Sequence, residues 1–371
     1  MRAALPLTCG LLLLLAGCAT RPDAQAFEAP TLARLAIVSA ADADGTPLGD
    51  PPPARQLGKR NDVLLLSGGG SVGAFGAGVL VGWTASGTRP QFDVVTGIST
   101  GALMATLAFL GPAHDAELTR AYTEITDKDV MKRRGIIGFA RKASVYDRTP
   151  LEKMIEVIVT EQLLDEVAAE HRKGRRLYVG TTNLDNGAAT VWDMGRIASS
   201  ALPNRIQLYR RVLAASAAIP GVFSPVYISQ TAGLPTMHVD GSIKQGLLLR
   251  SYMVDPRGAN EHVWTIVNGQ MRLIGNDAPS GTNSGSIAGR TVRELLRTIT
   301  QRAVARAYTM ARNARAEFHL AYLPDTVEEP SPIRFEPAAL RRLFEAGRSI
   351  GAKGQWQTEP PRLERYERMA Q

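Results

Sequence analysis

The sequence predicts an α/β fold of three layers, in which helices cover both faces of a mostly parallel central sheet. Two short apolar runs, Asp62 to Leu66 and Phe92 to Val95, each lead into a glycine-containing turn and then into a helix-like stretch. Short uninterrupted apolar runs are typical of parallel strands that are buried on both faces. Strands that alternate with helices in this way build a parallel sheet with helices packed on it.

The composition agrees with one large globular domain and narrows the choice of partners. Of 371 residues, 44% are hydrophobic and 21% are charged, which is ordinary for a globular protein. The net charge is +8, but the basic residues are scattered along the chain and only 6% of the residues are aromatic. This pattern argues against a nucleic-acid partner, and it favours an anionic lipid surface or simple solubility as the reason for the charge.

The first residues have the features of an export signal. Arg2 precedes an apolar run from Leu5 to Leu15, which is too short to span a bilayer as a helix. The tetrapeptide that ends at Cys18 is Leu-Ala-Gly-Cys, and it resembles the lipobox of bacterial lipoproteins. The resemblance implies that Cys18 carries a lipid and, because Ala19 follows, that the protein lies at the outer membrane of a bacterial envelope. An ordinary signal peptide with an alanine-rich cleavage site is the alternative.

The chain divides into three parts on this interpretation. Residues 1–17 are a signal peptide, and residues 18–60 are a lipidated tether, rich in Pro, Ala and Asp with one apolar patch at 32–38. Residues 61–371 form the folded domain. The only other cysteine, Cys9, is lost with the signal peptide, so the mature chain has no internal disulfide.

A glycine-rich turn follows the first predicted strand of the domain. Gly68, Gly70 and Gly73 fit the Gly-x-Gly-x-x-Gly fingerprint of dinucleotide-binding proteins. That fingerprint also requires an acidic residue at the end of a second strand, whereas Asp93 lies at the start of its strand. A turn without side chains at the start of a helix can instead serve as an oxyanion hole, because its amides stabilise developing negative charge. A simple packing turn is the remaining alternative.

The second predicted strand leads into Gly97, Ser99 and Gly101, a Gly-x-Ser-x-Gly pentapeptide. A strand, this pentapeptide and a helix together are the pattern of a nucleophile elbow, the sharp turn that exposes a catalytic serine. The glycines are needed because such a turn leaves no room for side chains beside the serine. A glycine-serine turn that arose by chance is the alternative.

The rest of the chain supplies the remaining elements. Helices are expected over 113–126, 151–158, 209–219, 291–317 and 337–347, and strands over 176–182, 188–193, 237–242, 262–267 and 318–323. A surface loop is expected over 272–289, which is rich in Gly, Ser, Asn and Asp. The arginines at 290, 293 and 297 share a face of the long helix, interpreted as solvated, with a lipid-facing patch as the alternative. No Cys/His cluster has metal-binding spacing, so we predict neither a metal nor a cofactor.

An aspartate completes the set of motifs. Asp240 ends a predicted strand and is followed by Gly241. In this order the glycine turn, the pentapeptide and the Asp-Gly pair resemble the patatin-like phospholipase family, whose members hydrolyse lipid acyl esters with a serine-aspartate dyad. The blocks Ala77 to Leu80 and Ala215 to Pro220 also resemble this family, and the resemblance covers about 62–249.

The resemblance implies a patatin-like three-layer fold and a role for each motif. Ser99 would be the nucleophile and Asp240 its base, while the amides of Gly68, Gly69 and Gly70 would form the oxyanion hole. Supporting positions in the motifs would be Gly73, Gly97, Gly101 and Gly241. The expected activity is that of a phospholipase A, a lysophospholipase or an esterase. An aspartate near its ordinary pKa of ~3.9 is a weak base at neutral pH, so burial has to raise this pKa.

The chain departs from the family pattern at two positions. Val72 stands where many members carry an arginine or a lysine, and Ser242 follows Asp240-Gly241 where alanine or glycine is more usual. Val72 removes a positive charge close to the oxyanion loop. Val72 therefore affects the expectation in two respects: how strongly the loop stabilises an anion, and which lipid headgroup the protein prefers.

Two alternatives stay open at the level of sequence. An α/β-hydrolase would use Ser99 with Asp185 or Asp193 and with His262 or His319, in that chain order. His238 points to the same side of its strand as Asp240 and could line the site, although packing nearby is the simpler role. A lipid-binding envelope lipoprotein without turnover is the second alternative, and Val72 is its only support.

Overall fold

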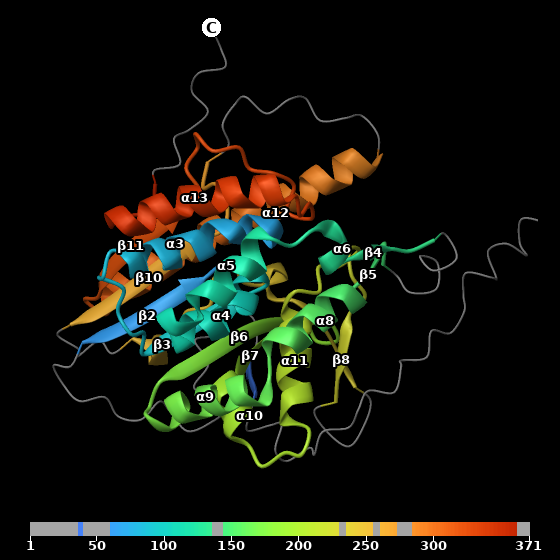
Figure 1. Cartoon of the computed structure of the whole chain (residues 1–371), viewed down its shortest axis with the longest axis horizontal. Helices are drawn as coiled ribbons and strands as arrows, with labels where there is room; N and C mark the ends of the chain where they lie inside the picture. Colours follow the sequence, from blue (N-terminus) through green and yellow to red (C-terminus); the bar gives the residue numbers. More distant parts are fainter. Residues whose placement is uncertain are drawn as a thin grey trace, which may run out of the picture.

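The computed structural model describes residues 36–39, 60–135, 144–229, 235–254, 260–272 and 284–361. The predicted signal peptide, Cys18 and most of the predicted tether lie outside the described residues. The helices and strands within these ranges form one layered body (Figure 1).

The centre of the body is a nine-stranded sheet in which the strands of the main path follow the order β1-β7-β6-β3-β2-β10-β11. Five neighbouring strands, from β6 to β11 in this order, are parallel. Strands β1, β7, β8 and β9 pair in antiparallel fashion. Their bounds are β1 Ala36–Ser39, β2 Asn61–Leu66, β3 Val94–Ile98, β6 Arg176–Asn183, β7 Ala189–Asp193, β8 Val226–Ile228, β9 Thr236–Asp240, β10 Glu261–Val267 and β11 Glu317–Tyr322, with the separate hairpin β4 Lys132–Arg133 and β5 Tyr146–Asp147. The prediction of a mostly parallel sheet is confirmed.

Helices cover both faces of this sheet (Figure 1). Successive side chains of β2 point to opposite faces of the sheet. Leu64 and Leu66 belong to the hydrophobic core on one face, and Val63 and Leu65 belong to the core on the other. The first core is closed mainly by α3, α4, α9, α11 and α13, and the second by α12. The helices are α3 Gly73–Ala85, α4 Thr100–Leu110, α5 Asp115–Thr123, α6 Asp127–Val130, α8 Thr149–Ile158, α9 Glu161–Arg172, α10 Met194–Ser199, α11 Arg205–Ser216, α12 Ser284–Asn313 and α13 Pro337–Lys353. The predicted three-layer arrangement is therefore present.

The structure differs from the sequence expectations at two segments. Residues 36–39, placed in the tether, pair with β7 as an edge strand of the sheet. Helix α12 begins at Ser284, inside the predicted loop 272–289, of which 273–283 lie outside the described residues. Within the described ranges, no helix is long and apolar enough to cross a membrane.

Candidate active site

Ser99 occupies a strained turn between β3 and α4. Its backbone angles are φ 56° and ψ −126°, and among the described non-glycine residues only Arg315 shares a positive φ. A side chain at Gly97 would collide with the carbonyl of Gly101, and one at Gly101 with the carbonyl of Leu66. These contacts explain both glycines, and the strained serine conformation is the one that a nucleophile elbow requires.

A second serine holds this turn in place. The Ser99 amide donates to Oγ of Ser216 over 3.0 Å, and the Ser216 hydroxyl donates to the carbonyl of Gly180 over 2.7 Å. Ser216 is fully buried at the end of α11. The block Ala215 to Pro220 thus supports the elbow, a role that the sequence did not reveal because it depends on a contact across 117 positions.

Asp240 ends β9 beside Ser99 and is 2% exposed. Its carboxylate accepts the amide of Ser242 over 2.8 Å, and the Ser99 side chain is close enough to lower the pKa of the carboxylate. Burial raises the pKa of Asp240 to about 6, while Ser99 and Ser242 work in the opposite direction. The carboxylate is therefore a stronger base than an exposed aspartate, as the sequence analysis required.

The glycine turn lies against both of these groups. Gly69 and Gly70 have φ angles of 150° and 55°, and a Cβ on Gly68 would lie 3.1 Å from Cβ of Ser99 and would collide with Oγ of Ser242. The amides of Gly68, Gly69 and Gly70 donate no hydrogen bond to any described residue. These amides at the start of α3 are available to an anion beside Ser99, as an oxyanion hole requires.

Asn268 fixes the shape of the glycine turn, and the sequence analysis missed it. Its amide donates to Oγ of Ser67 and its Nδ2 donates to the Ser67 carbonyl, each over 2.8 Å. Its Oδ1 accepts the amide of Gly76 over 3.1 Å. Asn268 follows β10, the neighbour of β2 in the sheet, so a polar residue directly after a buried strand was the available signal.

Val72 and Ser242, the two departures from the family pattern, have different surroundings. Val72 is 1% exposed and packs in the hydrophobic core. Ser242 contributes a further hydrogen bond from its side chain to Asp240. The glycine turn accordingly offers backbone donors without a cation of its own.

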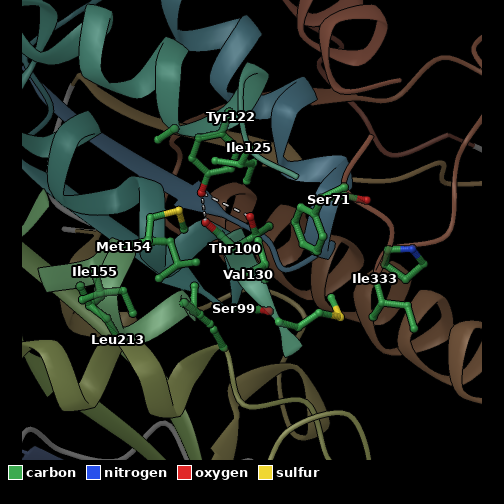
Figure 2. A pocket seen from close by; sticks show the side chains of 18 of the residues that line it. Ser71, Ser99, Thr100, Tyr122, Ile125, Val130, Met154, Ile155, Leu213 and Ile333 are labelled. Atoms are coloured by element: carbon green, nitrogen blue, oxygen red, sulfur yellow. Dashed lines mark hydrogen bonds between the residues drawn. The ribbon is translucent and has the colours of Figure 1, made fainter. Parts of the chain in front are cut away.

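An apolar pocket opens from Ser99. None of the side chains that line it carries a charge. Figure 2 shows Ser99 with Leu213 and Ile155 on one side and Ile333 on the other. The floor beside Ser99 is fixed by Tyr122, whose hydroxyl donates to the Thr100 carbonyl over 2.7 Å. A pocket with so apolar a lining suits a fatty acyl chain.

The histidines of the triad alternative lie elsewhere. His262 and His319 stand at the amino ends of β10 and β11, whereas Ser99 follows the carboxyl end of the parallel strand β3. His238 is buried between Thr181 and Thr236. His114 contacts Glu117 and Glu166, and His171 lies near Asp193. No hydrogen bond joins a described histidine to Ser99 or Asp240, so the arrangement does not support a triad.

The carboxylates proposed for that triad are also engaged elsewhere. Asp185 accepts the amide of Met237 over 2.8 Å. Asp193 accepts the amide of Arg196 over 2.9 Å and caps α10. Both have structural partners, and neither takes the place of Asp240 beside Ser99.

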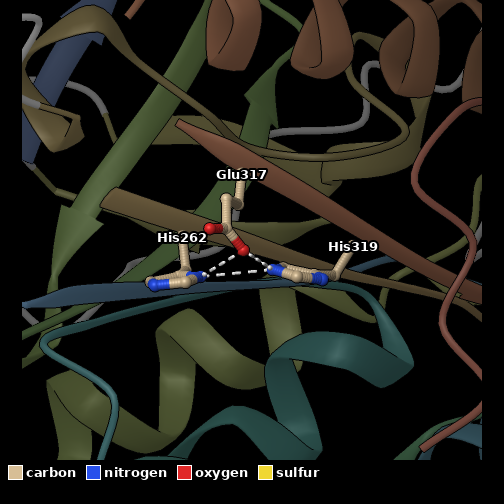
Figure 3. A group of neighbouring side chains, drawn as sticks. All are labelled: His262, Glu317 and His319. Atoms are coloured by element: carbon tan, nitrogen blue, oxygen red, sulfur yellow. Dashed lines mark hydrogen bonds and ion pairs between the residues drawn. The ribbon is translucent and has the colours of Figure 1, made fainter. Parts of the chain in front are cut away.

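Three side chains away from the site bring metal-ligating atoms together, namely His262, Glu317 and His319. Strand pairing creates this group, so residue spacing could not predict it. Figure 3 shows Nδ1 of His262 and Nε2 of His319 facing each other, 3.2 Å apart in rings only 19° from parallel. Two nitrogens that bind one tetrahedral ion at about 2.0 to 2.1 Å lie about 3.4 Å apart. The observed separation fits a hydrogen bond and would also fit a shared ion.

Comparisons with known proteins identify the family of the chain. The family model described as patatin-like phospholipase matches residues 64–251, about half of the chain, and the chain belongs to this family. None of the curated proteins matches the sequence. A crystal structure of VipD from Legionella pneumophila superimposes with a TM-score of 0.43 at 11% identity, covering 90% of this chain and 71% of that one.

Proposed function

We propose that this protein is a serine hydrolase of lipid acyl esters, of the phospholipase A, lysophospholipase or esterase type. One observation carries the proposal: Ser99, in a strained elbow, lies beside the buried carboxylate of Asp240 and beside three glycine amides that donate to no described residue. The apolar pocket at the same serine indicates a fatty acyl substrate.

The geometry supports a two-step mechanism. Asp240 accepts the proton of the Ser99 hydroxyl as the serine oxygen attacks the ester carbonyl. The amides of Gly68, Gly69 and Gly70 stabilise the resulting oxyanion. When the intermediate collapses, Asp240 returns the proton to the departing alcohol and the acyl group stays on Ser99. Water, deprotonated by Asp240, then releases the fatty acid and restores the serine.

Two substitutions test the dyad. With a short-chain ester as substrate, Ser99→Ala and Asp240→Asn should each reduce kcat/KM by about a thousandfold or more, because each removes a group that acts only in the chemical step. His319→Ala is the matched control and should retain activity. Activity that survives Asp240→Asn but not His319→Ala would favour the triad. Lipid binding without turnover of any acyl ester would favour the non-catalytic lipoprotein.

We further propose that lipidated Cys18 holds the protein at the outer membrane of a bacterial envelope after removal of residues 1–17. This proposal has its support in the sequence Leu-Ala-Gly-Cys and the apolar run before it. Mass spectrometry of the mature protein should find the lipid on Cys18 as the first residue. A mature protein in the soluble fraction without lipid mass on Cys18 would contradict the anchor.

A further inference from the structure

Large apolar side chains are exposed together on the first half of α12. Among the described residues five large hydrophobic side chains are strongly exposed, and three of them lie within nine positions of this helix: Ile287 at 52%, Val292 at 47% and Leu295 at 59%. Isolated exposed apolar residues need no explanation, but a group on one element indicates an interaction surface.

The helical repeat places these three residues on the side of α12 that faces away from the core. At 100° per residue they fall within one broad stripe, opposite the stripe of Val304, Ala307 and Ala311, which are buried against the sheet. The helix therefore has one apolar face that holds it to the body and a second that contacts no core.

A basic side chain accompanies this second face. Arg302 is exposed seven positions after Leu295, hence on the same side of the helix. Arg293 is also exposed, but the helical repeat places it on the side of α12 that faces the body, next to the glycine turn. Apolar side chains combined with Lys or Arg are typical of helices that lie in a membrane interface, where anionic lipids attract the positive charge.

The same part of α12 adjoins the glycine turn. Arg293, Leu296 and Arg297 line a pocket together with Gly68 and Gly69. Figure 1 shows the amino-terminal end of α12 extending beyond the sheet, on the side to which β2 points. A bilayer that contacts α12 would therefore lie close to the end of the sheet where the candidate active site is.

We propose that the first half of α12, from Ser284 to Arg302, docks on a phospholipid bilayer that contains anionic lipids. Ile287, Val292 and Leu295 enter the boundary between headgroups and acyl chains, and Arg302 contacts lipid phosphates. The inference rests on the proposed lipid substrate for its purpose, but its test does not depend on turnover.

A site-specific fluorescent label tests the docking directly. In the full chain with Ser99→Ala, Cys9→Ala and Cys18→Ala, a single cysteine replaces Val292 or Leu295 and carries a polarity-sensitive dye. Vesicles of phosphatidylcholine with phosphatidylglycerol should shift the emission of both labels to the blue, and salt should weaken the effect. A label at Thr309, exposed near the other end of α12, is the control and should not respond.

Other outcomes would overturn the proposal. Labels that stay in water at every lipid concentration contradict docking. A blue shift that grows with protein concentration without vesicles would assign this face to a second copy of the chain. A shift of the Thr309 label equal to that of Leu295 would mean that the first half of α12 has no special contact.

A variant links docking to turnover. In the chain with an intact Ser99, Ile287→Asp, Val292→Asp and Leu295→Asp together should slow hydrolysis of vesicle phospholipid about tenfold or more, with hydrolysis of a water-soluble ester unchanged. Thr309→Asp, which adds one negative charge near the other end of α12, is the position control. Equal rates on vesicles would contradict the proposal. Loss of both activities in the unsubstituted chain would instead contradict the hydrolase, and the label experiment would still decide the docking.

Discussion

At the scale of single residues, the environment of Asp240 decides whether two side chains suffice for catalysis. The carboxylate is buried without a cation among the groups that influence its pKa. Desolvation therefore acts nearly alone, opposed only by Ser99 and Ser242. In the proposed mechanism this raised pKa lets the carboxylate take the proton of serine without help from a histidine.

The pH dependence of the reaction should report this group. Because burial raises the pKa of Asp240 to about 6, kcat/KM for a neutral, water-soluble ester should rise about tenfold per pH unit below 6 and level off above it. The measurement is a pH-rate profile of the wild-type protein between pH 4 and 8. A profile already flat at pH 4.5 would show that a carboxylate with an ordinary pKa, or another group, acts as the base.

The same buried charge should lower stability. A folded-state pKa above the unfolded value of about 3.9 means that ionisation opposes folding: the cost is absent below pH 4, grows as the pH rises through the folded value and is complete above it. Asp240→Asn should therefore increase the free energy of unfolding at pH 7 by up to about 3 kcal/mol. Denaturant unfolding at pH 7 and pH 4 checks this, and the gain should largely vanish at pH 4. A variant less stable than the wild type at pH 7 would contradict the account.

At the scale of elements, local patterns predicted the parts that carry the site. The strands before Gly68 and before Ser99 are short apolar runs closed by glycines, and both signals are contained within a few residues. The supports of the site were not predictable in this way. Ser216 and Asn268 act on segments 117 and about 200 positions away, and β1 is a strand only because β7 lies beside it.

The contact between α3 and α13 shows a further requirement that sequence patterns did not reveal. A Cβ on Gly347 of α13 would collide with the Phe75 carbonyl of α3, and a Cβ on Gly78 of α3 with the Phe344 carbonyl. The two helices thus approach with their backbones in contact. Because α3 begins with the glycine turn, this contact also holds the candidate oxyanion loop against the sheet.

Gly347→Ala tests the contact. Within a helix this substitution ordinarily stabilises by up to about 1 kcal/mol, but here it should destabilise by about 1 to 3 kcal/mol because the new methyl group meets backbone atoms. Gly135→Ala, at a position with open space around it, is the control and should change stability by less than about 0.5 kcal/mol. Unchanged or increased stability of Gly347→Ala in a denaturant titration would contradict the close approach.

At the scale of the whole molecule, the parts fit an enzyme that works on lipid at a surface. An uncharged pocket opens from Ser99, the exposed face of α12 lies near the same end of the sheet, and the net charge is +8. The proposed lipid on Cys18 would keep the domain near its substrate, and α12 would orient it. The sequence alone predicted the family and proposed Ser99 and Asp240 as the reacting side chains. The proposed docking surface appears only when residues 287–302 are seen outside the core.

The most direct test of the central claim is the site of covalent modification. A long-chain alkyl fluorophosphonate, which reacts with activated serines and resembles the acyl ester, should label the wild-type protein once. Peptide mass spectrometry should place the adduct on Ser99, and Asp240→Asn should slow labelling by about a hundredfold or more because the serine loses its base. An adduct on another residue, or labelling of Ser99 at an unchanged rate in Asp240→Asn, would contradict the serine-aspartate dyad.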